Sequence, residues 1–358
     1  MQTSISPSLS HKLANMGFVC ACLVVALHAL AIGSPETIVW WQRPLTADGI
    51  CTVGVPFFFF ASGYFLAGHI HERGWWWRET KKRVKSLLVP YFAWSVLFVL
   101  LALPLVLTAN KLAGAPWSRN IPLSLSDWLA TFGIPPFAAD PYLPALWFVR
   151  TLFIFVLCSP FLAYPFRHCK ALGFTWLLLL FVLQGFLPSP STNGFENALL
   201  DSWFSLKGLF YFSLGLFLRV QGNSLCIPKW IKPLILLLGL AAFLLHFWAI
   251  DNDMGTLWFA NTKWVAIPVS LVALWSIVPS RQWPRWLTDS AFPIYLIHWT
   301  ILSYFGVLLW NLPIRDTLMK AIPTYWVLTA VTVVACLLAA FLMRRVTPRI
   351  AAFLFGGR

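Results

Sequence analysis

The sequence predicts an all-helical protein that crosses a membrane about ten times. Of its 358 residues, 59% are hydrophobic and only 11% are charged, whereas soluble proteins carry about 25% charged residues. The mean hydropathy is +0.75, and apolar runs long enough to cross a bilayer recur along the chain. Because no water-soluble fold could bury so much apolar surface, the expected class is a polytopic integral membrane protein, with one domain over residues 1–358 and no appended soluble domain.

Ten apolar runs have the length and composition of membrane-spanning helices. They lie near residues 13–33, 50–69, 86–107, 145–165, 170–187, 204–219, 232–250, 262–279, 290–310 and 323–343. No internal repeat is visible, so the inverted halves typical of many transporters are not expected. The connection over 108–144 is proline-rich and too polar to span, and loops of this length often serve as lids or binding loops.

Lysine and arginine gather in alternate connections between these runs, as they do on the cytoplasmic side of membrane proteins. The basic residues that we assign to this side are Lys12, Arg73, Arg78, Lys81, Lys82, Arg83, Lys85, Arg167, Lys170, Arg219, Lys229, Lys232, Arg281, Arg285, Arg344, Arg345, Arg349 and Arg358. The acidic residues that we assign to the outside are Glu36, Asp48, Asp127, Asp140, Glu196, Asp201, Asp251, Asp253 and Asp316. This asymmetry predicts that both termini are cytoplasmic. The formal charge of +14 therefore reports topology, and nucleic acid is not expected as a partner.

The seven cysteines show neither a CxxC pair nor the spacing of metal ligands. Most of them fall within or near the predicted spans, where they suit small packing positions. We therefore expect no disulfide framework and no bound metal.

His28 lies inside the first predicted span, LANMGFVCACLVVALHALAI. It follows Leu13 by about 22 Å of helix, which places it in the outer half of the membrane if the N-terminus is inside. An imidazole in a membrane helix costs free energy unless it has a partner or a task. It is either a packing residue hydrogen-bonded to a neighbouring helix or a general base that removes a proton from a hydroxyl.

Two further spans carry polar candidates. The second span contains Ser62, Gly63 and Tyr64 in VPFFFFASGYFL; small residues usually allow close helix packing, and the two hydroxyls are candidates for lining a cavity. The fourth span opens with Trp147 and Arg150 in LWFVR. Arg150 either extends its charged end toward the interface or faces a polar cavity, with Trp147, and orients a substrate oxygen or carboxylate.

The ninth span carries a second buried histidine in SAFPIYLIH. Tyr295 and His298 are three residues apart and share one face of a helix. They are either a hydrogen-bonded packing contact between helices or part of the same cavity as His28. His246, near the outer end of the seventh span, is interpreted as interfacial.

A basic segment precedes the third span and contains Lys81, Lys82, Arg83 and Lys85. It is expected to form an inner loop that anchors the topology. Clustered Lys and Arg also bind polyphosphates, so this segment is the candidate site for a phosphate-bearing substrate.

Taken in order, six blocks resemble the signature of the acyltransferase 3 family. They are the outer histidine of the first span, VPFFFFASGYFL, KKRVKSLLVPYF, ALWFVRTLFIF, FYFSLGLFL and SAFPIYLIHWTIL, and together they cover nearly the whole chain. The family motif places a basic residue eleven positions before the histidine, where this chain has Gly17, and the nearest preceding base is Lys12. The family also tends to have a paired-arginine motif in the first inner loop. In this chain Arg83 matches the first position of that motif, and Ser86 stands at the second.

The resemblance implies a ten-span enzyme of the bacterial inner membrane. Such enzymes move an acyl group, usually acetyl, from cytoplasmic acyl-CoA to a hydroxyl of a surface glycan, a lipid-linked saccharide or a related acceptor. It implies acyl-CoA as donor substrate and no bound cofactor, with His28 as the base or acyl carrier. Two alternatives stay open from the residues alone. The first is a small-molecule or proton-coupled transporter in which His28 and His298 relay protons. The second is a non-catalytic membrane scaffold or a flippase for lipid-linked intermediates.

Overall fold

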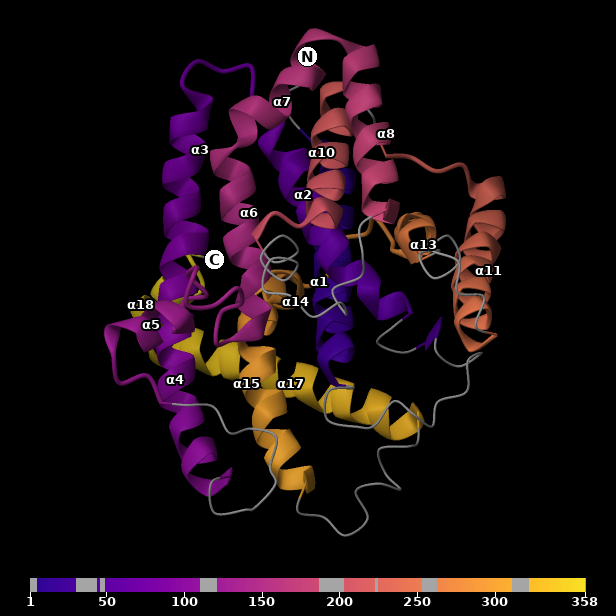
Figure 1. Ribbon diagram of the computed structural model, residues 1–358. Helices are drawn as coiled ribbons and strands as arrows, with labels where there is room; N and C mark the ends of the chain where they lie inside the picture. Colours follow the sequence, from indigo (N-terminus) through magenta and orange to yellow (C-terminus); the bar gives the residue numbers. More distant parts are fainter. Residues whose placement is uncertain are drawn as a thin grey trace.

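Helices make up all the regular secondary structure in the described part of the chain. The computed structural model describes residues 5–29, 44–45, 49–109, 121–186, 203–222, 225–252, 263–310 and 322–357. The helices are α1 (Pro7–Ala29), η4 (Ile50–Val53), α2 (Gly54–Leu66), α3 (Trp75–Arg83), η5 (Val84–Leu88), α4 (Val89–Ala109), α5 (Leu125–Thr131), η6 (Pro144–Leu146), α6 (Trp147–Leu157), α7 (Ser159–His168), α8 (Lys170–Phe186), α10 (Leu206–Val220), η7 (Lys229–Ile231), α11 (Lys232–Asp251), α13 (Lys263–Ile277), α14 (Arg285–Thr288), α15 (Ala291–Trp310), α17 (Ile322–Val346) and α18 (Pro348–Leu354) (Figure 1).

Five of the described helical segments are long and apolar enough to cross a bilayer, and a bent pair would make a sixth. The five segments are Pro7–Ala29, Ile50–Ala67, Trp75–Pro104, Lys229–Ala249 and Thr324–Val346. This confirms a polytopic helical membrane protein. Each predicted run contains a helix, but several are short, such as Lys263–Ile277, so the number of ten spans stays a prediction.

The predicted fourth span is broken. Pro144–Leu157 and Ser159–His168 meet at an angle of 57°. Pro160 in the first turn of α7 lacks the backbone N–H that would continue the helix and restricts the residue before it. The hydroxyl of Ser159 donates instead to the carbonyl of Val156, at 2.6 Å.

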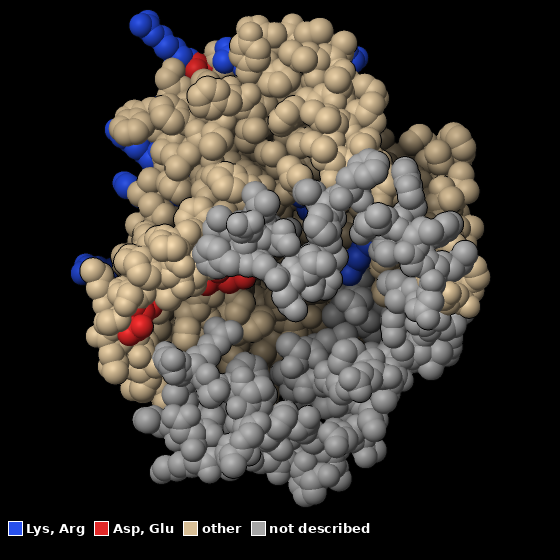
Figure 2. Space-filling model, viewed as in Figure 1, with Lys and Arg blue, Asp and Glu red and all other residues tan. Residues whose placement is uncertain are grey.

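The basic segment before the third span is helical and not a loop, which corrects the prediction. Residues 75–83 form α3, residues 84–88 form one π-helical turn, and α4 follows directly. A π-helical turn is rare and frequently marks a functional site. Figure 2 shows Lys and Arg side chains along the upper and left edges of the face drawn, where Figure 1 places α3 and the α7–α8 connection.

α2 and α10 pack most closely at the centre of the bundle. A Cβ on Gly63 would collide with the backbone carbonyl of Phe212, and one on Gly215 with that of Phe60. Close packing is therefore confirmed for Gly63. α1 lies on another side of α2, where a Cβ on Gly54 would come within 2.8 Å of the carbonyl oxygen of Cys20.

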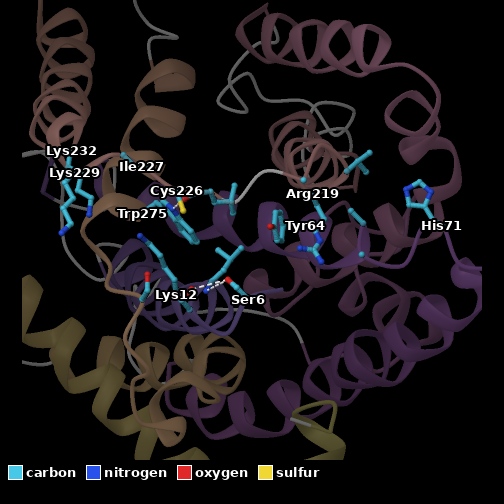
Figure 3. Close-up of a pocket in the computed structure, with 18 of the residues that line it drawn as sticks. Ser6, Lys12, Tyr64, His71, Arg219, Cys226, Ile227, Lys229, Lys232 and Trp275 are labelled. Carbon is cyan, nitrogen blue, oxygen red and sulfur yellow. Dashed lines mark hydrogen bonds between the residues drawn. The ribbon is translucent and has the colours of Figure 1, made fainter. Parts of the chain in front are cut away.

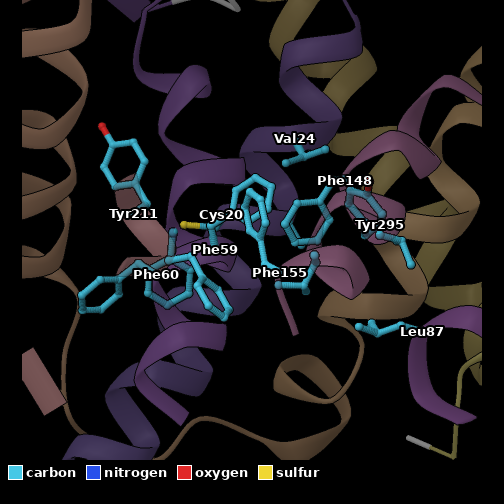
Figure 4. Close-up of a cluster of buried hydrophobic side chains, with 14 of the residues drawn as sticks. Cys20, Val24, Phe59, Phe60, Leu87, Phe148, Phe155, Tyr211 and Tyr295 are labelled. Atoms are coloured by element: carbon cyan, nitrogen blue, oxygen red, sulfur yellow. The ribbon is translucent and has the colours of Figure 1, made fainter. Parts of the chain in front are cut away.

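Aromatic and aliphatic side chains fill the space between α1, α2, α6 and α15. The rings of Phe59 and Phe148 meet edge to face with centroids 4.7 Å apart. Cys20 and Val24 of α1 lie in the same cluster (Figure 4). α17 crosses α1 and α15 at a steep angle (Figure 1), and the hydroxyl of its Tyr325 donates to the carbonyl of Ala26 near the end of α1, at 2.7 Å.

The long connection before α6 contains the short helix α5. The hydroxyl of Ser124 accepts from the backbone N–H of Asp127, and the carboxylate of Asp127 accepts in return from the backbone N–H of Ser124. Hydrogen bonds that the Asp127 carboxylate accepts from the side chain of Ser124 and from the backbone N–H groups of Ser124 and Leu123 hold the pKa of Asp127 below its usual value. The capping box fixes where α5 begins.

Candidate active site

His28 packs against a second histidine at the end of α1. Its ring stacks on that of His298 from α15, with centroids 5.3 Å apart and an interplanar angle of 24°. The ring of Trp299 meets His28 edge to face at 4.6 Å. The two histidines, 270 positions apart in sequence, therefore lie side by side. That they line a common cavity stays a prediction.

The hydrogen bonds of His298 fix its tautomer. Its Nδ1 lies 2.6 Å from the carbonyl oxygen of Tyr295 and 3.2 Å from that of Ile294. Because a carbonyl oxygen only accepts, Nδ1 carries the proton, and in the neutral ring Nε2 keeps its lone pair. Within the described residues Nε2 is buried and has no hydrogen-bond partner. An acceptor nitrogen is thus available in the ring that stacks on His28.

Tyr295 joins α15 to the start of α6. Its hydroxyl donates to the carbonyl of Ala145, and its ring lies 5.5 Å from that of Phe148 and 5.9 Å from that of His298. Tyr295 is therefore a packing contact between helices as well as a neighbour of the histidine pair. The arrangement holds α15 in the register that places His298 against His28.

Arg150 is buried within the protein and does not extend to the interface. Its side chain is 7% exposed. Nη1 donates to the carbonyl of Gly133 at 2.7 Å and Nη2 to that of Ala139 at 2.9 Å, and the guanidinium lies 4.3 Å from the ring centroid of Trp203. Arg150 thus fastens the connection that follows α5 onto α6.

We expect Arg150→Lys to loosen this connection. One ammonium cannot reproduce two directed guanidinium contacts, and each lost hydrogen bond to a charged group costs about 1.5–3 kcal/mol. The melting temperature of the purified protein should fall, and proteolysis within residues 121–143 should accelerate. Arg285→Lys, at an exposed arginine of α14, is the matched control. A changed KM for the acceptor with unchanged melting and proteolysis would instead assign Arg150 to the substrate.

The other predicted cavity residues divide between two places. Trp147 is half-buried beside Phe59, with ring centroids 6.2 Å apart, and so lies on the aromatic cluster next to Phe148. Ser62 and Tyr64 lie in the last two turns of α2, away from the end that contacts α1 near Val24. Tyr64 is 1% exposed, with the guanidinium of Arg219 5.3 Å from its ring centroid. Ser62 and Tyr64 therefore do not lie beside His28.

The four predicted donor-binding residues point in different directions. Lys81 lies 5.0 Å from the ring centroid of Trp77, and Lys82 pairs with Glu79 at 2.7 Å. Arg83 is half-buried and Lys85 is exposed. Lys82 and Arg83 border a cavity of about 450 Å³ that Glu79 also lines.

A larger basic cavity lies at the end of the bundle where α1 begins. Its volume is about 650 Å³, and Lys12, Arg219, Lys229 and Lys232 line it. Figure 3 shows Lys229 and Lys232 on one side, Arg219 beside Tyr64 on the other, and Lys12 between them. We call this space the basic cavity. Lys12 and His28 lie on one helix, about 24 Å apart at 1.5 Å per residue.

Sequence reasoning missed several residues of these sites. Trp299 follows His298 directly, and its contact with His28 depends on the crossing of α1 and α15. Arg219, Lys229 and Lys232 were interpreted as topology signals only, because nothing in the sequence shows that they converge on Lys12.

His246, interpreted as interfacial from its position in the sequence, is buried between helices. The side chain is 3% exposed and its ring lies 5.0 Å from that of Phe247. α11 buries this face against α13. His246 is thus a packed histidine of the bundle.

The family model described as an acyltransferase domain, Acyl_transf_3, matches residues 15–343. The chain belongs to the acyltransferase 3 family. It is also similar to the succinoglycan biosynthesis protein ExoH of Rhizobium meliloti (strain 1021), with 23% identity over 328 residues that cover 89% of this chain and 82% of that protein. No solved structure shows a significant match.

As a member of the acyltransferase 3 family, the protein is a membrane-embedded acyltransferase. The matched region includes His28, Arg150 and His298 as well as most of the described helices. It begins after Lys12, so the first cation of the basic cavity lies outside the matched region.

Proposed function

We propose that the protein transfers an acyl group, acetyl in the expected case, from cytoplasmic acyl-CoA to a hydroxyl of a surface glycan or lipid-linked saccharide. The observation that carries the proposal is the stacking of His28 on His298 beside Trp299 at the end of α1. The family supports acyl transfer, and the similarity to a succinoglycan biosynthesis protein supports a saccharide acceptor.

His28 acts on the acceptor hydroxyl in this reaction. A neutral imidazole takes the hydroxyl proton as the oxygen attacks the thioester carbonyl. The tetrahedral intermediate then expels the CoA thiolate, which receives that proton from the imidazolium. The products are an ester and free CoA. If His28 first carries the acyl group itself, the same atoms are exchanged in two steps through an acyl-imidazole.

The positions of His28 and of the basic cavity fit substrates that arrive from opposite faces of a bacterial inner membrane. The cations lie where α1 begins, and His28 lies near its other end. Phosphates are too polar to cross hydrocarbon, so the donor approaches from the cytoplasm, which the charge asymmetry assigns to the basic end. The acceptor approaches His28 from the outside.

The proposal predicts chemistry with purified components. Protein in lipid nanodiscs, given labelled acetyl-CoA and a bacterial surface saccharide fraction, should form labelled ester together with free CoA in equal amounts. Nanodiscs without the protein are the control. In proteoliposomes, movement of saccharide or protons without any CoA release would contradict the proposal and favour a transporter or flippase.

A further inference from the structure

The basic cavity gathers four cations from parts of the chain that are distant in sequence. Lys12 comes from α1, Arg219 from the end of α10, Lys229 from η7 and Lys232 from the start of α11. Like charges repel, so their convergence on one space of about 650 Å³ is unfavourable unless anions occupy it. A volume of this size is ordinary for a nucleotide-sized ligand.

Glu72, an acidic residue that lines the basic cavity, is already paired with two other side chains. Glu72 pairs with His69 at 3.0 Å and with Arg78. The hydrogen bond from His69, with the charges of His69 and Arg78, lowers the pKa of Glu72 from its usual value. Across the described ranges, no ion pair involves Lys12, Lys229 or Lys232.

The smaller cavity of about 450 Å³ has a weaker attraction for an anion. Its Lys82 is paired with Glu79, whose carboxylate also lines the space. An incoming phosphate there would displace or repel this carboxylate. Arg219 borders both cavities, but the three lysines that have no ion pair among the described residues line the larger one.

An apolar cavity continues the basic cavity along α2. Its volume is about 230 Å³, and it shares Trp275 and the segment 225–227 with the basic cavity. Phe60 and Phe57 line it one and two turns beyond Tyr64. A Cβ on Gly17 would lie 4.0 Å from the ring of Phe57, so this apolar space reaches partway from the level of Lys12 toward that of His28.

We propose that the basic cavity binds the diphosphate and ribose phosphate of the acyl-CoA donor through Lys12, Arg219, Lys229 and Lys232, and that the apolar cavity takes the start of its pantetheine arm. This inference rests on the proposed function. It assigns the donor phosphates to these residues in place of the segment Lys81–Lys85. The ion pair of Lys82 with Glu79 supports the change.

The test measures CoA binding directly. Calorimetric titration of the purified wild-type protein with CoA is compared with that of K229Q/K232Q and of Lys12→Gln. Each lost charge-assisted hydrogen bond should weaken binding roughly tenfold, so the double variant should bind CoA at least tenfold more weakly. Wild-type affinity should also fall with added salt. The control R167Q/K170Q removes two exposed charges near the α7–α8 connection and should bind as wild type does.

The outcomes separate this inference from the proposed function. If wild-type protein binds no CoA, the acyl-CoA donor itself is wrong. If wild type and K229Q/K232Q bind CoA equally while K81Q/K82Q/K85Q binds it weakly, the donor stands and the basic cavity is wrong. A polyprenyl diphosphate in detergent that binds in place of CoA would assign the cavity to a lipid and overturn the inference. Melting curves show whether each variant is folded.

Discussion

Replacing His28 with alanine should lower acyl transfer by about 10²–10⁴-fold, because that is the usual contribution of a general base. His28 is half-buried near the end of α1, and its ring contacts are with His298 and Trp299. Removing the ring should therefore leave the bundle intact. The measurement is the rate of ester formation from labelled acetyl-CoA in nanodiscs, with melting temperature and membrane insertion recorded for the same preparation.

The matched control is His246→Ala. This histidine also lies in a predicted span, but it packs on Phe247 in α11, a helix that packs mainly against α13. The control should lose some stability and keep its rate per folded molecule. An inserted, folded His28→Ala protein with wild-type activity would show that His28 is not the base. Acyl label retained on the wild-type protein and absent from His28→Ala would assign the covalent route.

Composition and charge were sufficient to predict the class of fold. Apolar runs at regular intervals predicted the helices, because the length of a span is set by the thickness of the bilayer. The bend at Ser159 was foreseeable from Pro160, but the hydropathy of 145–165 is continuous and hides it. The helical state of Lys81–Lys85 was missed because a run of charges suggests a loop, whereas α3 continues into α4 through the π-helical turn.

The histidine pair was only partly predictable. Each ring was identifiable as a polar group in an apolar span, but their 5.3 Å stacking depends on how α1 and α15 cross. The same limit applies to Arg150. The sequence left open whether it faces the interface or a cavity, and its hydrogen bonds to Gly133 and Ala139 come from a connection whose path no local pattern indicates.

Gly63→Ala should strongly destabilise the protein, although it adds a single methyl group. The added Cβ would collide with the backbone carbonyl oxygen of Phe212, and a backbone atom in a packed helix cannot rotate away as a side chain can. Overpacking of a tight contact costs about 1–3 kcal/mol, and occasionally more, and here α2 and α10 must separate. We expect a much lower melting temperature and loss of monodisperse protein in detergent.

Gly17→Ala is the matched control, since Gly17 is also a buried glycine of a spanning helix. Its added Cβ would meet only the ring of Phe57, at 4.0 Å, and alanine is favoured over glycine within a helix. Gly215→Ala should behave as Gly63→Ala does, because its Cβ would meet the carbonyl of Phe60 across the same interface. One separation of α2 from α10 relieves both collisions, so the double variant should cost less than the two single variants added together. Equal melting temperatures for Gly63→Ala and Gly17→Ala would mean that α2 and α10 do not meet through their glycines.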